Sequence, residues 1–411
     1  MTKEQAVQRA AWQSMPLILI CGSLIAMLGF GPRSTLGFFL TPMSTANGWG
    51  RDVFALALAL QMLLWGAAQP FVGAIADRFG PVLVLSLGAV LYAIGFALMT
   101  FATTPGEMYL SAGVLIGFGL AGSSFTVVLG AFGKLLEPKW RSVSFGVGTA
   151  AGSFGQFLFS PLAVALNANM DWHTTLLIFA GVVLLIVPLS LALAKPIEQK
   201  SSGPQVALQS APAALSEALS HRSFIYLLLG FFTCGFQIFF ITVHLPAYLV
   251  DRGLSADIGA YTIGTVGLFN IVGSVLAGYL SNRMPKRYLL SGIYFLRAIA
   301  IAIYIALPVS VASSLIFGAV MGILWLSTVP PTNALVALMF GTRWLTMLAG
   351  FAFFSHQVGG FLGIWLGGVV FERMGSYGPI WWLAILLGIF AGLINLPIKE
   401  QAVARPAAAT V

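Results

Sequence analysis

Long apolar stretches, each bounded by a few polar residues, follow one another along almost the whole chain. A helix needs about 20 apolar residues to cross the hydrocarbon core of a bilayer, and twelve stretches reach that length. They lie at residues 15–43, 53–76, 81–103, 107–133, 140–167, 172–194, 223–250, 257–281, 287–308, 311–340, 345–371 and 376–397. The pattern predicts an all-α membrane protein with twelve transmembrane helices, and the even number puts both termini on the same side.

One polar segment, residues 195–222, divides this series into two equal groups. It is rich in Ser, Pro and Gln, which is typical of a linker, and a short amphipathic turn is expected near residues 215–219. We therefore predict an N-terminal six-helix bundle over residues 1–194, a cytoplasmic linker over 195–222 and a C-terminal six-helix bundle over 223–411. The first apolar stretch is longer than the roughly 7–15 residues of a secretory signal, which favours a retained span.

Charge is scarce in this chain and unevenly placed. Only 8% of its 411 residues are charged and 59% are hydrophobic, whereas soluble domains carry about 25% charged residues. This composition excludes a soluble enzyme, a nucleic-acid-binding module and a secreted disulfide scaffold. Fifteen lysines and arginines fall in segments on the side of the N-terminus, against three on the other side, Arg51, Arg252 and Arg373. The positive-inside rule then predicts cytoplasmic termini in the cell (inner) membrane.

The two groups of spans carry related loops. The loop after the second span contains Gly73, Asp77, Arg78 and Gly80, and the loop after the eighth span contains Gly278, Asn282 and Arg283. The first glycines of the two loops are 205 residues apart, which is half the chain. Two parallel copies of six spans predict pseudo-symmetric halves with a binding site at their interface.

These loops resemble the G-x-x-x-D-R-x-G motif of the major facilitator superfamily and its second-half copy, and the resemblance covers essentially the whole chain. It implies the major facilitator fold, in which two six-helix bundles rock to give alternating access. It also implies that spans one, four, seven and ten line the cavity. The seven loop residues are thereby assigned to conformational change.

A narrower resemblance is carried by the first span. Residues 32–34 (Pro-Arg-Ser) and 38–39 (Phe-Phe) are similar to the monocarboxylate-porter group, where a Lys or Arg after proline belongs to the substrate and proton path. Residues 139–150 resemble that group's second motif. The chain departs from this group, and from the related oxalate–formate exchangers, in the eighth span, where Ser274 and Asn270 occupy the positions of an arginine and an acid.

Two arginines lie inside predicted spans. Arg33 is about eighteen residues into the first span, near or just beyond the bilayer centre, where an unpaired arginine costs at least about 2.5–3.5 kcal/mol. The preceding Gly29 to Pro32 segment is expected to interrupt the helix and present a positive helix N-terminus. Arg297 lies at mid-depth in the ninth span. For both arginines, the alternative to substrate contact is a structural role. Arg33 would then bind the backbone carbonyls freed by Pro32, and Arg297 would bind carbonyls of span eight or ten.

No carboxylate is available at the same depth. The acids all fall in loops, tails or the first turn of a span: Glu4, Asp52, Asp77, Glu107, Glu137, Asp171, Glu198, Glu217, Asp251, Asp257, Glu372 and Glu400. A buried cation needs a counter-ion, and the simplest one is an anionic substrate. The sequence therefore predicts a secondary transporter of a small organic anion, a monocarboxylate by the resemblance, moved with a proton or by exchange.

Histidines and amides inside the spans complete the predicted site. Histidine side chains in general can take up and release a proton near neutrality. His356, in the eleventh span, is therefore assigned to substrate contact and proton coupling, and His244, late in the seventh span, to gating. Mid-span amides are assigned to hydrogen bonding with the substrate: Gln61, Gln156, Gln237 and Asn270. The alternative for each is a packing role between helices, where a polar contact is worth about 0.6 kcal/mol.

No motif indicates a metal, a cofactor or an enzymatic centre. Residues 117–122 match a G-x-G-x-x-G dinucleotide pattern, but they lie within an apolar span with no strand before them. Two other functions stay open. Efflux of amphipathic or aromatic compounds is favoured by 32 Phe and 10 Trp, and a membrane sensor would bind a ligand without moving it. A protein of either transport type is expected to work as a monomer in the bilayer.

Overall fold

The computed structural model describes residues 13–39, 43, 46–49, 51–194 and 209–403, which form helices joined by short loops. Most of the predicted linker, residues 195–208, lies outside the described residues, as do the two ends of the chain. Within the described part, twelve helical segments are long and apolar enough to cross a membrane. The prediction of an all-α protein with twelve transmembrane helices is therefore confirmed.

The N-terminal half contains four single helices and two spans made of several pieces. The single helices are α1 (Met15–Ser34), which is followed by the 3-10 turn η1 (Leu36–Phe39), α3 (Arg51–Phe79), α4 (Pro81–Phe101) and α8 (Pro138–Asn169). The fourth span comprises α5 (Pro105–Met108), the π-helical η2 (Tyr109–Leu115), α6 (Ile116–Gly122) and α7 (Phe125–Leu135). The sixth span comprises α9 (Trp172–Val183), α10 (Ile186–Ser190) and the 3-10 turn η3 (Leu191–Leu193).

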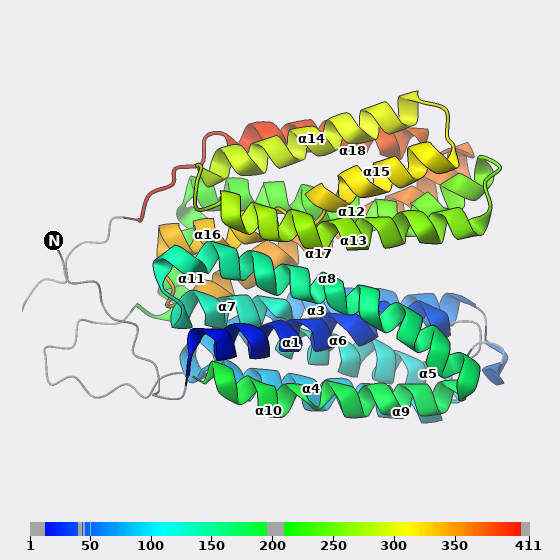
Figure 1. Ribbon diagram of the computed structural model, residues 1–411, viewed down its shortest axis with the longest axis horizontal. Coiled ribbons are helices and arrows are strands. Elements are labelled where there is room, and N and C mark those ends of the chain that lie inside the picture. The colour runs from blue at the N-terminus through cyan, green and yellow to red at the C-terminus, as the bar shows by residue number, and fades with distance from the viewer. Residues whose placement is uncertain (1–12, 40–42, 44–45, 50, 195–208, 404–411) are drawn as a thin grey trace, which may run out of the picture.

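The C-terminal half begins after a short helix that lies in the predicted linker. That helix is α11 (Ala211–Ser220), which covers the residues where the amphipathic turn is expected. The spans are α12 (Arg222–Asp251), α13 (Ala256–Leu280), α14 (Lys286–Ala306), the broken pair α15 (Val311–Leu324) and α16 (Val329–Phe340), α17 (Leu345–Met374) and α18 (Gly378–Asn395). Figure 1 shows the two halves as separate bundles lying side by side.

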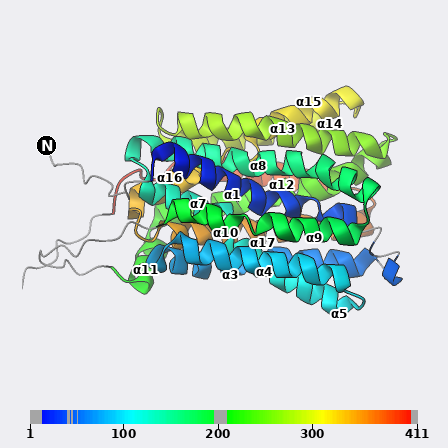
Figure 2. The ribbon, with the colours of Figure 1, turned by 60° about the horizontal axis from the view of Figure 1, so that its bottom comes forward.

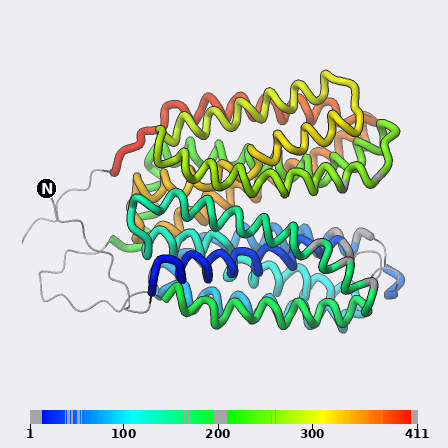
Figure 3. Tube along the Cα trace, viewed as in Figure 1, coloured from blue at the N-terminus to red at the C-terminus, as the bar shows by residue number. Residues whose placement is uncertain are grey.

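The outside of both bundles is apolar, as a lipid-facing surface requires. Phe71 on α3 is 71% exposed and Ile316 on α15 is 65% exposed. The start of α1, the helix α11 and the residues that follow α18 all lie at one end of the bundles, as Figures 2 and 3 also show. We call this end the terminal face.

The two halves pack tightly against each other near the terminal face. A Cβ atom on Gly73 of α3 would lie 2.5 Å from the carbonyl oxygen of Thr346 on α17, and one on Gly278 of α13 would lie 2.6 Å from that of Ser142 on α8. No side chain fits at either position, which explains why both loop motifs begin with glycine. The first residue of each motif is thus a contact point between the halves.

Candidate functional site

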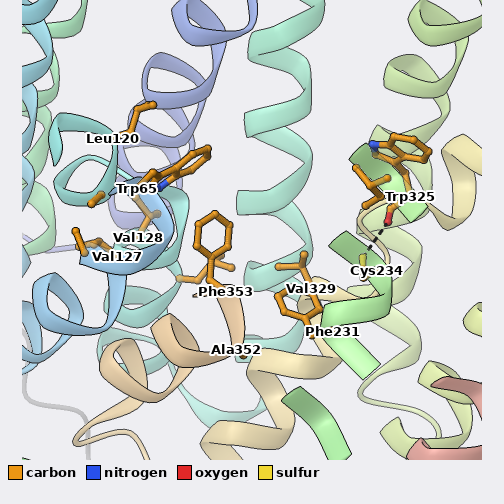
Figure 4. Close-up of a cluster of buried hydrophobic side chains, with 14 of the residues drawn as sticks. Trp65, Leu120, Val127, Val128, Phe231, Cys234, Trp325, Val329, Ala352 and Phe353 are labelled. Atoms are coloured by element: carbon orange, nitrogen blue, oxygen red, sulfur yellow. Dashed lines mark hydrogen bonds between the residues drawn. The ribbon is translucent and has the colours of Figure 1, made fainter. Parts of the chain in front are cut away.

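A cavity of about 110 Å³ lies between the two halves. The N-terminal half lines it with Phe30, Arg33, Trp65, Phe125 and Gln156, and the C-terminal half with Phe231, Ile238, Phe239, Thr242, Trp325, Leu326, Val329, Phe353, His356 and Gln357. Figure 4 shows Trp65 of α3 beside Phe353 of α17. Three predicted site residues therefore meet in one cavity: Arg33, Gln156 and His356.

The guanidinium of Arg33 is held against aromatic rings and keeps donors free. Its Cζ lies 5.2 Å from the ring centre of Trp65 and 5.9 Å from that of Phe30, a cation–π arrangement. Nη2 donates to Sδ of Met62, which is a weak acceptor, and Nε is buried without a hydrogen-bond partner. Among the described residues, no carboxylate forms an ion pair with Arg33. The site therefore presents a cation that lacks a counter-ion.

The predicted helix interruption before Arg33 is wrong. α1 continues through Pro32 and ends at Ser34, so that Arg33 lies in its last turn. A proline inside a helix removes one backbone hydrogen bond, and here the surrounding packing keeps the helix intact. The C-terminal end of a helix is partially negative and favours a cation. The end of α1 therefore helps to hold Arg33 instead of attracting an anion itself.

His356 reaches the cavity from α17. Its Nδ1 lies 3.3 Å from Oε1 of Gln357, and its Nε2 is buried without a partner. Gln357 Nε2 donates to the carbonyl of Met62 at 3.4 Å, and Met62 also accepts from Arg33. Arg33 of one half and His356 of the other are thus linked through Met62 and Gln357, directly across the interface.

Gln357 and the aromatic lining are absent from the sequence-based site. Gln357 is an amide in the middle of a span, the same criterion that selected the other amides, so the sequence carried that signal. No sequence signal distinguished Trp65 and Phe353 as site residues, because aromatic residues are spread throughout the apolar stretches.

The other predicted amides join helices and do not line this cavity. Gln61 Nε2 donates to the carbonyl of Ala112 at 2.7 Å, and Gln237 Nε2 to that of Ala384 at 2.9 Å. Asn270 connects the halves, because its Nδ2 lies 2.6 Å from Ser153 Oγ on α8. In this conformation these side chains have the packing role that was the alternative for each.

Arg297 is fully buried on α14 and lies outside the cavity lining. Its Nε donates to the carbonyl of Leu324 at 3.0 Å, Nη2 donates to the carbonyls of Leu324 and Trp325, and Nη1 lies 3.4 Å from Gln237 Oε1. Leu324 ends α15, where carbonyls lack intrahelical partners. Arg297 therefore stabilises the break in span ten.

Arg297→Leu is expected to reduce stability and to leave ligand binding unchanged. Each buried carbonyl left without a donor costs about 1–3 kcal/mol, so the melting temperature in detergent should fall clearly. The folded fraction should still bind the ligand with unchanged affinity. A variant with the wild-type melting temperature but no binding would instead place Arg297 in the ligand site.

His244 also joins two helices of one half. Its Nε2 lies 2.9 Å from the carbonyl of Ile364, which connects α12 to α17. The ring is half-buried and lies outside the cavity lining.

The first loop motif caps a helix of the opposite half. The carboxylate of Asp77 accepts hydrogen bonds from the amides of Thr346 at 3.2 Å and Met347 at 2.8 Å, and Lys134 Nζ lies 2.5 Å from its Oδ1. Both amides belong to the first turn of α17, where N–H groups lack partners and negative charge is favoured. Gly80 then takes a φ of 97°, which a glycine adopts without strain and which allows α4 to begin directly.

The second motif makes a different contact. Asn282 Nδ2 donates to the carbonyl of Lys139 at 2.9 Å, in the first turn of α8. Because the Asn282 amide donates to a carbonyl through this contact, the contact does not satisfy the free N–H groups at the start of α8. The exposed Arg78 and Arg283 lie over the rings of the neighbouring Phe79 and Tyr279. Of the two motifs, the first is therefore the one that makes a charged contact between the halves within the described part of the chain.

This architecture is that of a multi-pass membrane protein with two pseudo-symmetric six-helix bundles around a central cavity. Among the described residues, no group of three His, Cys, Asp or Glu side chains could hold a metal ion. The sequence profile of the Major Facilitator Superfamily matches residues 22–364. The chain belongs to this superfamily, whose members are membrane transporters and not enzymes.

Individual relatives and solved structures agree with that assignment. The chain is 27% identical over 372 residues to the MFS-type transporter YcxA of Bacillus subtilis (strain 168), covering 88% of each chain. It is 26% identical over 389 residues to monocarboxylate transporter 13 of Rattus norvegicus, covering 93% of this chain and 88% of the relative. The structure of the MFS transporter FucP matches with a TM-score of 0.73 at 17% identity, covering 94% of this chain and 99% of FucP. The structural similarity to FucP shows that this chain has the same fold.

Proposed function

We propose that the protein is a secondary transporter of a small organic anion, a monocarboxylate, by alternating access between its halves. The observation that carries the proposal is Arg33, a cation at the interface with a buried unpartnered Nε and no carboxylate partner among the described residues. A carboxylate accepts two parallel hydrogen bonds from a guanidinium and balances its charge. Monocarboxylate transporters 13 and 11 among the relatives support the same substrate class.

The proposed orientation places the terminal face in the cytoplasm of the cell, as the distribution of Lys and Arg favours. The close contacts at Gly73 and Gly278 lie at this face, so the conformation is closed toward the cytoplasm. Substrate would enter from the outside in this state. Counterflow of labelled monocarboxylates in proteoliposomes tests the proposal, and absence of saturable exchange for every acid tried would contradict it.

His356 is the proposed proton carrier. Arginine does not release its proton in proteins, whereas histidine titrates near neutrality. A carboxylate bound to Arg33 brings negative charge close to His356, because both side chains line one cavity. His356 is the one lining side chain that can both take up and release a proton, so it is our candidate for the proton that moves with the anion.

His356→Gln is expected to remove the stimulation of uptake by an inward proton gradient. Substrate affinity should change by less than about fivefold, because Arg33 is intact and a single neutral hydrogen bond is worth about 1 kcal/mol or less. His244→Gln is the matched control, since that ring binds a carbonyl away from the cavity. Uptake by the His356 variant that still responds fully to the gradient would exclude this residue as the carrier.

The aromatic lining favours a second candidate, export of amphipathic aromatic compounds. A neutral or cationic compound would leave Arg33 without a counter-ion, so the cavity fits an anionic one better. Growth-inhibition profiles of an expressing host separate the two functions, because export of neutral or cationic compounds should survive Arg33→Gln.

A further inference from the structure

The cavity has an aromatic wall as well as a charge. Seven of its fifteen lining residues are Phe or Trp, whereas 13% of the whole chain is aromatic. Packing in an apolar bundle needs bulk, but Leu or Ile supply it equally well. The concentration of rings at this one place therefore points to a ligand that benefits from aromatic contact.

The rings form a continuous surface that begins at the cation. Trp65, which lies under the Arg33 guanidinium, has its ring centre 5.0 Å from that of Phe353 on the other half. Phe353 in turn meets Phe125 at 5.9 Å and an interplanar angle of 83°. Offset and edge-to-face arrangements at such distances are the favourable geometries between aromatic groups.

We infer that the substrate is a monocarboxylate carrying a single aromatic ring, of the arylacetate type. This inference rests on the proposed function and specifies its substrate. The carboxylate binds Arg33, and the ring packs against Trp65, Phe125 and Phe353. An apolar cavity of about 150 Å³ is known to hold one benzene, so a cavity of about 110 Å³ is too small for a compound with two rings.

Charge restricts the substrate further. Arg33 is the one lining side chain with a permanent charge, and it balances one carboxylate. A second carboxylate would face aromatic rings and would be costly to desolvate. The site therefore selects a monoanion against a dianion.

Four acids of graded chemistry test this substrate on the purified protein. Equilibrium binding and thermal shift should rank phenylacetate above cyclohexylacetate, which has similar bulk without a π system, and both above propionate. Phenylmalonate, a dianion with the same ring, should bind more weakly than phenylacetate. The expected preference for phenylacetate over cyclohexylacetate is about 2- to 10-fold.

Phe353→Leu should weaken the binding of phenylacetate about 2- to 10-fold. The affinity for propionate should change less than twofold. Phe125→Leu, at a half-buried position, provides a second variant in case the buried Phe353 is needed for folding. Phe361→Leu is the matched control, because Phe361 lies on the same helix with a 50% exposed ring stacked on Trp365. It should change none of the affinities.

The outcomes separate this inference from the proposed function. If propionate binds as tightly as phenylacetate, or if both ring variants weaken the two acids by the same factor, the aromatic preference is wrong while the anion site stands. If no acid binds to the wild-type protein, or if Arg33→Gln leaves all affinities unchanged, the anion site itself is wrong and the aromatic assignment falls with it.

Discussion

Arg33→Gln is expected to reduce monocarboxylate transport by about 100-fold or more. Removing one partner of a buried ion pair typically costs about 3–5 kcal/mol, and each 1.4 kcal/mol is about tenfold in affinity. Arg33→Lys should retain part of the activity, because an ammonium keeps the charge but loses the two-pronged geometry and the stacking on Trp65. Initial rates of counterflow in proteoliposomes measure both effects.

Although Arg33→Gln should abolish most transport, we expect it to leave the stability of the protein unchanged or to increase it. Without substrate, the half-buried Arg33 lacks a counter-ion among the described residues, so its removal relieves a cost. Arg33→Gln should therefore melt at the wild-type temperature or above it, while substrate no longer raises the melting temperature. Arg252→Gln is the control, since Arg252 is exposed at the end of α12 and should change neither property. A destabilised Arg33→Gln protein would indicate a structural arginine.

The contrast between Arg33 and Arg297 shows how far the sequence predicts the site. Both arginines lie deep in apolar spans, and the count of spans and the depth of each residue follow from helix length alone. Whether a side chain points to the cavity depends on the rotation of its helix. When every face of a span is apolar, periodicity does not reveal that rotation.

The same limit explains the amides. Gln156 and Gln357 line the cavity, whereas Gln61 and Gln237 bond to carbonyls of neighbouring helices. Nothing in their local sequence separates the two pairs, because the choice is made by packing between distant spans. The loop motifs were predictable because glycine, aspartate and arginine at fixed spacing are a local signal. The partner of Asp77 on α17, by contrast, is about 270 residues away in the chain.

The contact between Asp77 and the start of α17 is the basis of a second prediction, which concerns the conformational equilibrium. Asp77→Asn should shift the protein away from the conformation closed at the terminal face. The substitution removes the charge that pairs with Lys134 and faces the N-terminal end of α17. In a partly buried geometry the interaction of a charge with a helix end is worth up to about 2 kcal/mol, which is roughly a 30-fold change in the conformational equilibrium.

Spin labels at Leu83→Cys on α4 and Tyr288→Cys on α14, two exposed positions near the terminal face in different halves, would report this shift as a longer distance. The matched control is Asn282→Ala in the second motif, whose contact is a single exposed hydrogen bond. It should change the distance distribution much less than Asp77→Asn does. Pseudo-symmetry of the fold alone predicts equal effects from the two loops, whereas the observed bonding predicts unequal ones. Equal shifts would therefore show that the ion pair and the capped helix do not hold the terminal face closed.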